Sequence, residues 1–568
     1  MTLLKDLIAV ANGQQKADLV LKNGQLINVF SGEIYSADVA VAAGYIAGVG
    51  DYTGEEEIDL NGRYITPGFI DSHIHIESTL LTPPELAKVI VPCGTTAMIC
   101  DPHEIANVLG LTGIRYLIDA GKGLPVDMFF AAPSCVPSTE LETSGGLIKA
   151  ADIKTLFKDG QVIRLGEMVN FKGVLEQDKA VMAKIKAAGD AGVEGHAPGL
   201  SGKALNAYIA AGIGSDHESV GFDEAREKLK AGMQILVRQG SSAKNLEAIL
   251  PLITPANSRF FSFCTDDILP TDLAQGHINA VLKRAVELKL DPVVAIQLAT
   301  INPARFYGLK RHGAIAPGYL ADINIISNLE DFKVDLVIKR GVKVASRGKP
   351  LFEAKSKAPA SVKHTVKMKP FEVDAFGIKA KSDYAKAIEL VPGQILTKSI
   401  VVSVKKQGKL VVADPASDVL KLAVIERHKG KGNIGLGLVK GFGLKKGALA
   451  TSVAHDAHNI ICVGAADEDM ISAVRRVAKL QGGLVVVRGG LVLAELPLPI
   501  AGLMSDLPLN KVLAKLRKVE QSLKELGIKV EEPFGLLSFL ALPVVPELRL
   551  TDMGLVDTNK LCFTELFE

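Results

Sequence analysis

Short apolar runs alternate with amphipathic stretches of helical period between residues 65 and 312. The runs are ITPGFIDSHIHI, TTAMICDPH, VDMFFAAPS, VIRLGEMVN, VEGHAPG, GIGSDHES, MQILVRQGS and RFFSFCTDD. Strands that alternate with helices form parallel sheets, and eight such units suit a closed barrel of the TIM type. We therefore predict a (β/α)8 barrel over residues 67–312. An open, doubly wound sheet is the alternative, and it fits the number of runs and their total length less well.

The segments on both sides of this region have the period of two that is typical of strands. In residues 1–66 the alternation is interrupted at Asn23-Gly24 and Asn61-Gly62, pairs that favour the tight turns of β-hairpins. Residues 313–350 show the same alternation. We expect the two segments to pair and to form one small β-sandwich-like domain, in which residues 313–350 complete the module of residues 1–66.

The rest of the chain divides into a linker and a further domain. Residues 351–369 are rich in Lys, Ala and Ser, a composition typical of linkers. Residues 370–568 contain apolar strands such as NIICVGA and amphipathic helices such as LNKVLAKLRKVEQSLKELG. The predicted fold class is therefore α/β, with a central barrel, a flanking β domain and a C-terminal α+β domain.

Length, charge and cysteine content limit the number of domains, the kinds of partner and the cellular compartment that we expect. Its 568 residues exceed what one hydrophobic core supports. A formal net charge of +2 gives no reason to expect nucleic acid or an anionic membrane as a partner. The six cysteines are scattered and form no C-x-x-C pair, which favours a reducing compartment. With neither a signal peptide nor an apolar run of membrane-spanning length, we expect a cytoplasmic protein.

His73 and His75 are the first candidates for chemistry. Residues i and i+2 of a strand share one face, so both imidazoles project from the same strand end and could bind one metal ion. Two surface histidines near a turn would have the same spacing. The H-x-H pattern alone is therefore weak evidence for a metal site.

Other polar residues cluster at the C-terminal ends of the runs, where TIM-type barrels place their active sites. They are His73, His75, His103, Glu167, His196, Asp216, His217, Asp266 and Asp267. Histidine is rare in this chain, with 11 in 568 residues, so its concentration at one end of the predicted barrel is informative. Four of these histidines and two carboxylates suffice for two divalent ions, and their N/O character suits Zn, Mn, Fe or Ni.

Several motifs make the sequence resemble a known family. The stretch ITPGFIDSHIHIE and the order of the eight runs resemble the amidohydrolase superfamily, and CDPHEIANV, LGEMVNFKGV, EGHAPGLSG, SDHES, FSFCTDD and TSVAHDAHNIICVG resemble its adenine deaminases. The resemblance implies hydrolysis of adenine to hypoxanthine and ammonia, in which a metal-bound hydroxide attacks C6, as a step of purine salvage. It also implies two Mn²⁺ or Fe²⁺ ions, with Zn²⁺ as a further option, and a homodimer.

The resemblance also assigns roles to individual residues. His73 and His75 would bind the first metal ion, and His196 and His217 the second. Glu167 stands where related hydrolases use a carboxylated lysine as a bridge, so it would either bridge the ions or carry a proton to a ring nitrogen. Asp266 would bind metal and accept the proton of the attacking water. Together Asp266 and Glu167 are the expected acid–base pair.

A second group of residues is expected to touch the substrate or to support the ligands. Its members are His103, Glu104, Arg238, His455, Asp456 and His458. For Arg238, a buried salt bridge is the competing interpretation. The HEI segment after the second run and the AHDAH segment of the last domain could equally be ordinary polar loop residues.

Two other functions compete with adenine deamination. One is a related amidohydrolase that acts on a different aminopurine or on a cyclic amide, although Glu167 in place of lysine weighs against hydantoinase-type chemistry. The other is a barrel that has lost catalysis and serves as a scaffold. A scaffold need not keep its ligands, whereas all six ligand positions are filled here.

Overall fold

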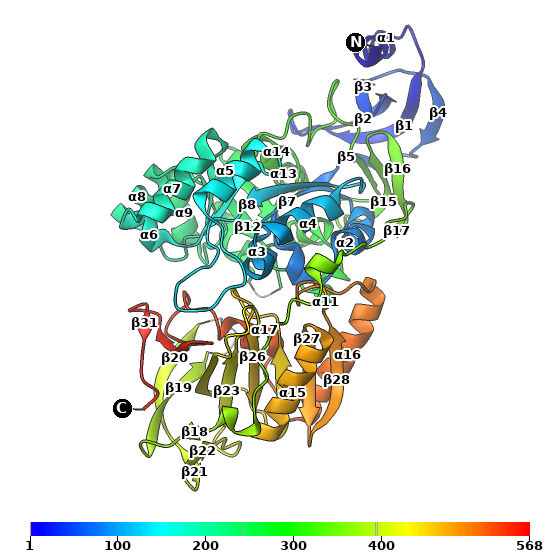
Figure 1. Ribbon diagram of the computed structural model, residues 1–568. Coiled ribbons are helices and arrows are strands. Elements are labelled where there is room, and N and C mark those ends of the chain that lie inside the picture. The colour runs from blue at the N-terminus through cyan, green and yellow to red at the C-terminus, as the bar shows by residue number, and fades with distance from the viewer. Residues whose placement is uncertain (1, 242, 392–393, 395, 568) are drawn as a thin grey trace.

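The structure is a computed structural model that describes residues 2–241, 243–391, 394 and 396–567. A β-rich region built from both ends of the first 350 residues lies at the upper right of Figure 1. A middle region of strands and helices follows, and a C-terminal region lies below it. The chain begins with a helix, α1 (Thr2–Ala11), which the sequence analysis assigned to a β module.

Eight parallel strands form the inside of the middle region, one in each of the eight apolar runs. They are β6 (Phe69–Ile74), β7 (Thr95–Cys100), β8 (Asp127–Ala132), β9 (Arg164–Met168), β10 (Val193–Gly195), β11 (Ser215–Asp216), β12 (Gln234–Arg238) and β13 (Phe261–Cys264). Strands β6 to β10 form one sheet in chain order, and β11 to β13 form another. Single parallel bridges, Val193 with Ile213 and Ile74 with Asp266, link the two sheets at both ends.

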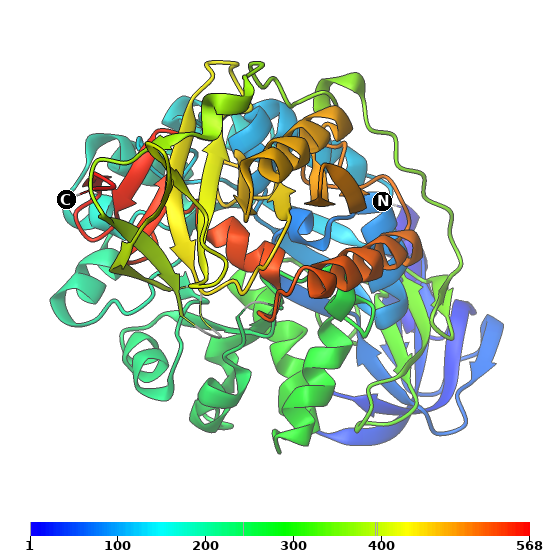
Figure 2. The same ribbon diagram turned by 90° about the horizontal axis from the view of Figure 1, so that it is seen from below.

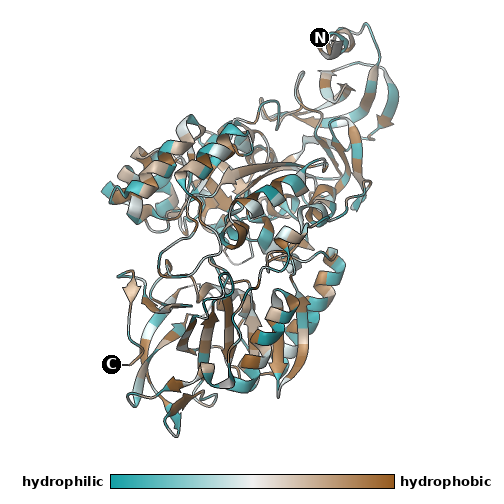
Figure 3. Cartoon of the chain, viewed as in Figure 1, coloured by the Kyte–Doolittle hydropathy of each residue, from teal (hydrophilic) through white to brown (hydrophobic). Residues whose placement is uncertain are grey.

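Helices surround these strands and explain why the strands are apolar on both faces. Every residue of β6, β7, β12 and β13 is buried. The helices are α2 (Pro83–Ile90), α3 (His103–Leu109), α4 (Leu111–Gly121), α5 (Ala150–Lys158), α6 (Phe171–Leu175), α7 (Lys179–Ala188), α8 (Gly202–Ala210), α9 (Phe222–Lys230), α10 (Leu246–Ile249), α11 (Pro270–Leu273), α12 (Ile278–Glu287), α13 (Pro292–Leu298) and α14 (Ile301–Phe306). Strands buried on both faces have continuous hydrophobic sequences. In Figure 3, hydrophilic and hydrophobic residues alternate along the helices of the middle region.

One nine-stranded sheet joins the segments that flank the middle region. Its order is β17-β16-β15-β14-β5-β1-β2-β3, and β4 also pairs with β1. The strands are β1 (Ala17–Ile27), β2 (Ile34–Ala42), β3 (Tyr45–Val49), β4 (Gly54–Asp59), β5 (Tyr64–Pro67), β14 (Ile323–Ile326), β15 (Val334–Lys339), β16 (Val342–Ser346) and β17 (Lys349–Pro350). Residues from both segments, such as Val39 and Ile323, share one apolar cluster. The region is thus a continuous sheet, not two separate ones.

Both hairpins predicted in this region are wrong. β1 continues through Asn23-Gly24, where its register with β2 shifts and Asn23 adopts a left-handed φ of 57°. Asn61-Gly62 connects β4 to β5, but these two strands pair in parallel with successive parts of β1. Asn-Gly tolerates positive φ, and that property serves bulges and corners as well as two-residue hairpins.

The C-terminal region is built around an eight-stranded sheet in the order β20-β19-β24-β23-β26-β25-β27-β28. Its strands are β19 (Tyr384–Leu390), β20 (Thr397–Ser403), β23 (Val419–Ile425), β24 (Ile434–Lys440), β25 (Ala448–Thr451), β26 (Ile460–Gly464), β27 (Gly483–Arg488) and β28 (Leu491–Pro497). Helices α15 (Asp467–Leu480) and α16 (Leu509–Glu525) lie on opposite sides of it (Figure 2). In β26, Ile460 packs in the cluster of α15, whereas Ile461 packs in that of α16.

Smaller elements complete this region. They are β18 (Ile378–Lys379), β21 (Lys405–Gln407), β22 (Leu410–Val412), α17 (Pro533–Phe539), β29 (Leu548–Thr551), β30 (Gly554–Asp557) and β31 (Cys562–Phe563). The region also shares a core with the middle region, because Leu498, Ile500 and Met504 belong to the same apolar cluster as Leu86 and Ile105. Among the described residues, no helix has both the length and the apolar character needed to cross a bilayer.

Candidate metal centre

Six side chains from five strands of the middle region meet at the carboxyl ends of those strands. His73 lies in β6 and His75 follows it, Glu167 lies in β9, and His196 and His217 directly follow β10 and β11. Asp266 comes two residues after β13. Neighbouring parallel strands end at the same edge, so residues up to 193 positions apart in sequence become neighbours.

Glu167 is at the centre of this group. Its Oε2 lies 2.8 Å from His196 Nδ1 and 3.1 Å from His217 Nε2. Its Oε1 lies 3.5 Å from His75 Nε2. Two of the groupings able to hold a metal ion share this carboxylate: one consists of His73, His75 and Glu167, and the other of Glu167, His196 and His217.

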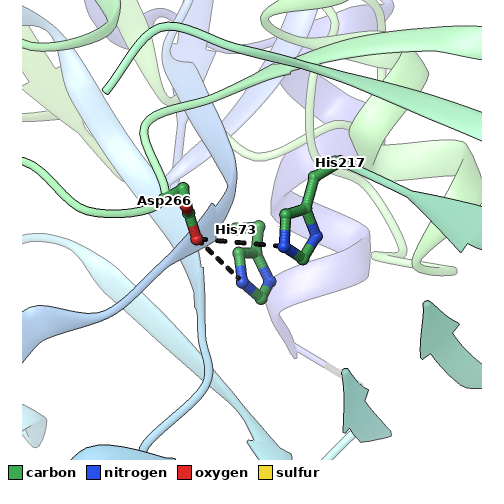
Figure 4. Close-up of side chains that lie close together, drawn as sticks. All are labelled: His73, His217 and Asp266. Atoms are coloured by element: carbon green, nitrogen blue, oxygen red, sulfur yellow. Dashed lines mark ion pairs between the residues drawn. The ribbon is translucent and has the colours of Figure 1, made fainter. Parts of the chain in front are cut away.

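Asp266 approaches the group from the other side. Its Oδ1 lies 3.1 Å from His75 Nε2 and 3.5 Å from His73 Nε2. The same oxygen is 4.0 Å from His217 Nε2, and the rings of His73 and His217 are stacked with centroids 4.5 Å apart. Figure 4 shows His73, His217 and Asp266 converging from separate strands. The sequence-predicted ligand set is therefore assembled in one place, where five members are buried and His196 is partly exposed.

The ring orientations of His73 and His75 fit a bound cation. His73 Nδ1 lies 3.0 Å from Glu194 Oε2, and His75 Nδ1 lies 3.0 Å from the carbonyl oxygen of Asp101. Both Nδ1 atoms can donate to these acceptors, so the Nε2 atoms, which face each other at 3.3 Å, would be unprotonated in the neutral rings that bind a metal ion. Two facing lone pairs repel each other unless a cation lies between them. This donor set suits a divalent ion bound by nitrogen and oxygen.

Arg238, at the end of β12, forms a buried salt bridge, which was the alternative to a role in substrate binding. Its Nη1 lies 2.6 Å from Asp266 Oδ2 and also contacts Glu218. Burial raises the pKa of Asp266, but its surroundings, first among them the Arg238 guanidinium, outweigh burial and hold that pKa well below its usual range. Asp266 is therefore a carboxylate at neutral pH, with one oxygen held by Arg238 and the other facing the histidines.

The backbone at Asp266 is not a regular strand. Asp266 has a φ of 57°, in the left-handed region, and its N–H donates to the carbonyl of His73. Its neighbour Asp267 is partly buried, but its side chain is not in the ligand group and its Oδ1 has no hydrogen-bond partner among the described residues. Alternation along a strand therefore does not explain why Asp266 alone reaches the centre.

The second group of predicted residues forms a contact between the middle and C-terminal regions. Glu104, on the first turn of α3, has one carboxylate oxygen at 2.5 Å from His455 Nδ1, and its other oxygen contacts His458 Nε2. Burial raises the pKa of Glu104, but His455 and His458 outweigh burial and lower it well below the usual range. His103 joins this contact to the metal-ligand group, because its Nδ1 lies 3.3 Å from Glu167 Oε1.

Asp456 lies beside this contact. It forms a further group of close donor atoms with His103 and Glu104, and all three side chains are largely buried. Burial is the largest cause that raises the pKa of Asp456. The AHDAH segment therefore reaches the mouth of the middle region with three polar side chains, although His455 lies 351 residues from Glu104 in sequence.

Sequence reasoning missed several supporting residues. Glu194 is fully buried in β10 and accepts from His73, while the Asp101 carboxylate accepts from the backbone N–H of Glu167 at 3.0 Å. Glu218 adds a carboxylate next to His217. Glu194 had a visible signal, since an acidic residue inside an apolar strand run is costly to bury without a partner. Its place two residues before His196 also puts both residues on the same side of the chain.

Comparisons with known proteins agree with this geometry. The Amidohydrolase family matches residues 64–344, and the Adenine deaminase C-terminal domain matches residues 394–562. Adenine deaminase from Desulfatibacillum aliphaticivorans is 49% identical over 564 residues, covering 99% of each chain. Adenine deaminase from Dehalococcoides mccartyi is 48% identical over 560 residues, covering 98% of each chain.

Among solved structures, an enamidase described as a member of the amidohydrolase superfamily is 18% identical, with a TM-score of 0.46. It covers 60% of this chain and 98% of its own. The relatives, in contrast, match from one end of the chain to the other at nearly half of all positions, and both the ligand strands and the C-terminal region lie within the match. The chain therefore belongs to the adenine deaminase family of the amidohydrolases.

Proposed function

We propose that this protein hydrolyses adenine to hypoxanthine and ammonia. The observation that carries the proposal is the full-length match to adenine deaminases, which includes the C-terminal region as well as the metal-ligand strands. The geometry supports a hydrolase, since six donor side chains meet at the carboxyl ends of parallel strands. We further propose that the eight strands form the (β/α)8 barrel expected from the sequence, with bridges closing the ring.

Two divalent ions would be held by this donor set. His73 and His75 would hold one, His196 and His217 the other, and Glu167 would bridge them, which its membership of two ligand groups supports. When bound, such ions supply a nucleophile at neutral pH because they lower the pKa of water. Mn²⁺ or Fe²⁺ is our proposal for the native metal, from the resemblance to the family.

Asp266 would act as the base and then as the acid. Its Oδ1 faces the histidines and can accept a proton from the attacking water, while Arg238 holds Oδ2 in place. The amine that leaves C6 needs a proton, and the protonated Asp266 can return it. Positioned proton transfer of this kind typically contributes about 10²–10⁴-fold in rate.

The ring nitrogen must also gain a proton as aromaticity breaks. If Glu167 bridges the ions, its oxygens are not free for this step, and His103, whose Nδ1 lies 3.3 Å from Glu167 Oε1, is the alternative donor. His103 Nε2 lies 3.5 Å from Glu104 Oε1, so the Glu104 carboxylate would favour the protonated imidazole. We therefore assign the ring-nitrogen proton to His103.

The C-terminal region would close the site over the purine. His455 and His458 reach Glu104 at the mouth, and the backbone N–H of Ser505 donates to the carbonyl of Leu80 at 2.8 Å. These contacts leave less space for bulk water beside the base. We accordingly propose residues 370–568 as a domain that completes the active site of the domain at 67–312, next to the β domain of residues 1–66 and 313–350 and the linker 351–369.

Ammonia release measured with adenine, adenosine, guanine, cytosine and hydantoin in the presence of Mn²⁺ tests the proposal. We expect turnover of adenine alone. Turnover of guanine or hydantoin in place of adenine would favour the alternative of a different aminopurine or cyclic amide. Metal analysis of the same sample separates a scaffold from an enzyme, because a scaffold would purify without stoichiometric metal.

We also propose a cellular location and an oligomeric state for the protein. All six cysteines are free thiols, which suits the reducing cytoplasm that we propose as its location. The homodimer implied by the family resemblance is likewise a proposal, and analytical ultracentrifugation of the metal-loaded protein tests it.

A further inference from the structure

A cavity of about 260 Å³ lies away from the metal-ligand group, between α3, the linker and the C-terminal region. Its lining includes Val108, at the C-terminal end of α3, and His428. Lys363, Thr365 and Lys367 from the linker complete its polar wall. Three parts of the chain that are remote in sequence thus enclose a space that is polar on one side.

The two segments that form this wall carry positive charge only. Residues 361–369 (SVKHTVKMK) and 427–431 (RHKGK) contain no carboxylate, and they lie side by side because the N–H of Lys367 donates to the carbonyl of Arg427 at 2.7 Å. Within the part of the chain that the structure describes, none of their lysines is within 4.0 Å of a carboxylate. The nearest acid in sequence, Glu426, accepts from backbone N–H groups of the same loop.

A buried guanidinium adds to this charge. Arg427 is fully buried and donates to the carbonyls of His458 and Ala501 and to Thr365 Oγ1 at 3.3 Å, and these partners are all neutral. Thr365 lines the cavity, so Arg427 lies directly behind its wall. The buried carboxylate of Glu426 favours the charged form of Arg427, but burial outweighs it and lowers the pKa of Arg427 to about 9. A buried cation that is only partly compensated is costly. An anion in the cavity would offset both Arg427 and the two lysines.

We propose that this cavity binds the phosphate group of a small phosphorylated ligand. Two lysines, Lys363 and Lys367, line this small concave space, and two ammonium groups suit a compact anion with two charges such as phosphate. The volume is below that of sites for drug-sized ligands, about 300–1,000 Å³, so the cavity holds the phosphate and little more. The rest of the ligand would extend toward the open side.

The segments that line the cavity also contact residues next to the metal-ligand group. His428 Nε2 lies 2.6 Å from the carbonyl of Ala457, and Arg427 contacts the carbonyl of His458. On the opposite side, Val108 belongs to the helix that carries Glu104, the partner of His458. An anion that tightens these walls would order the Glu104–His458 contact. This coupling, unlike the binding itself, rests on the proposed function and predicts a lower KM for adenine.

Calorimetric titration of the metal-loaded full chain with inorganic phosphate and with ribose 5-phosphate tests the site. The variant carries Lys363→Gln and Lys367→Gln, and the matched control carries Lys154→Gln and Lys158→Gln, two exposed lysines of α5. We expect the first pair to weaken binding by at least about tenfold, because two charged donors are lost, and the control pair to leave it unchanged. Tighter binding of ribose 5-phosphate identifies a phosphorylated metabolite, and equal binding identifies free phosphate.

Binding that survives the Lys363/Lys367 change, or that is competitive with adenine, would place phosphate at the metal centre and overturn the proposal. Absence of binding by both probes would also overturn it. Coupling is read separately, from the KM for adenine with and without phosphate. Where KM equals the dissociation constant of adenine, coupling free energies are reciprocal, and adenine must then tighten phosphate binding by the same factor. An unchanged KM with phosphate bound would refute the coupling while leaving the site.

Discussion

Glu194→Gln tests whether a carboxylate outside the ligand set holds a metal ligand in place. Glu194 and His73 are both fully buried, and a single 3.0 Å contact joins Glu194 Oε2 to His73 Nδ1. Glutamine keeps the shape and an acceptor oxygen but removes the charge that makes the His73 nitrogen a stronger donor to metal. Loss of such outer partners typically costs about 10–100-fold in metal affinity. That range corresponds to about 1.4–2.7 kcal/mol.

The assay is Mn²⁺ binding by competition with a chromogenic chelator, together with turnover as a function of Mn²⁺ concentration. We expect weaker binding and a turnover that recovers at saturating Mn²⁺, because Glu194 touches neither water nor substrate in the proposed mechanism. Glu85→Gln, a buried carboxylate of α2 paired with Lys88, controls for a neutral amide in the interior. Unchanged affinity in Glu194→Gln, or lost turnover that excess Mn²⁺ does not restore, would refute the positioning role.

Four further outcomes are expected. Asp266→Asn should lower kcat by about 10²–10⁴-fold while the protein stays folded and metal-loaded, and near-normal kcat would remove its assigned role. Glu104→Gln should raise the KM for adenine and lower Tm, since it loses its charge-assisted contacts with His455 and His458; an unchanged KM would separate the C-terminal region from substrate binding. Dialysis against a chelator should abolish ammonia release, and Mn²⁺ should restore it; activity that persists in metal-free protein would exclude metal-dependent hydrolysis. Asp127→Asn should lower Tm at pH 7, and its difference from wild type should begin to shrink only below about pH 4, near the unfolded-state pKa, and continue to shrink as pH falls further; a difference at pH 2 equal to that at pH 7 would contradict this pairing.

The pH dependence expected at Asp127 follows from its surroundings. Burial raises the pKa of this carboxyl, but His312, Lys339 and Arg340 outweigh burial and lower it below the usual range. A lowered folded-state pKa stabilises the protein above the unfolded-state pKa and loses that contribution as pH falls. Lys339 Nζ lies 2.6 Å from Asp127, so this contribution joins β8 to the flanking sheet.

The eight strands could be predicted from the sequence because strands buried on both faces are continuously hydrophobic. Segments with the 3.6-residue period of helices separate these apolar runs from one another. The hairpins predicted at Asn23-Gly24 and Asn61-Gly62 are wrong because strand pairing is not a local property. An Asn-Gly pair indicates a left-handed backbone conformation but not which strand pairs with which, and here both β4 and β5 pair with β1. Pairing depends on contacts between segments, which local propensity does not contain.

For the site, the sequence reveals which residues can donate to a metal ion and which of them lie at strand ends. This information is sufficient to name six candidate ligands. Their supporting contacts were not visible. These contacts depend on how the β-strands and loops pack in three dimensions. They are the contacts of Glu194 with His73, of Arg238 with Asp266, and of His455 with Glu104.

What the sequence alone determined is the periodicity of the middle region and the kind of chemistry its polar residues can perform, since both follow from local spacing and side-chain type. Only the tertiary structure decided which nitrogen of each histidine faces inward, which carboxylate is shared, and how the C-terminal region meets the mouth. The physical reason is that tautomers, shared ligands and buried charges are set by neighbours in space, and those neighbours come from segments as far apart as α3 and the AHDAH loop.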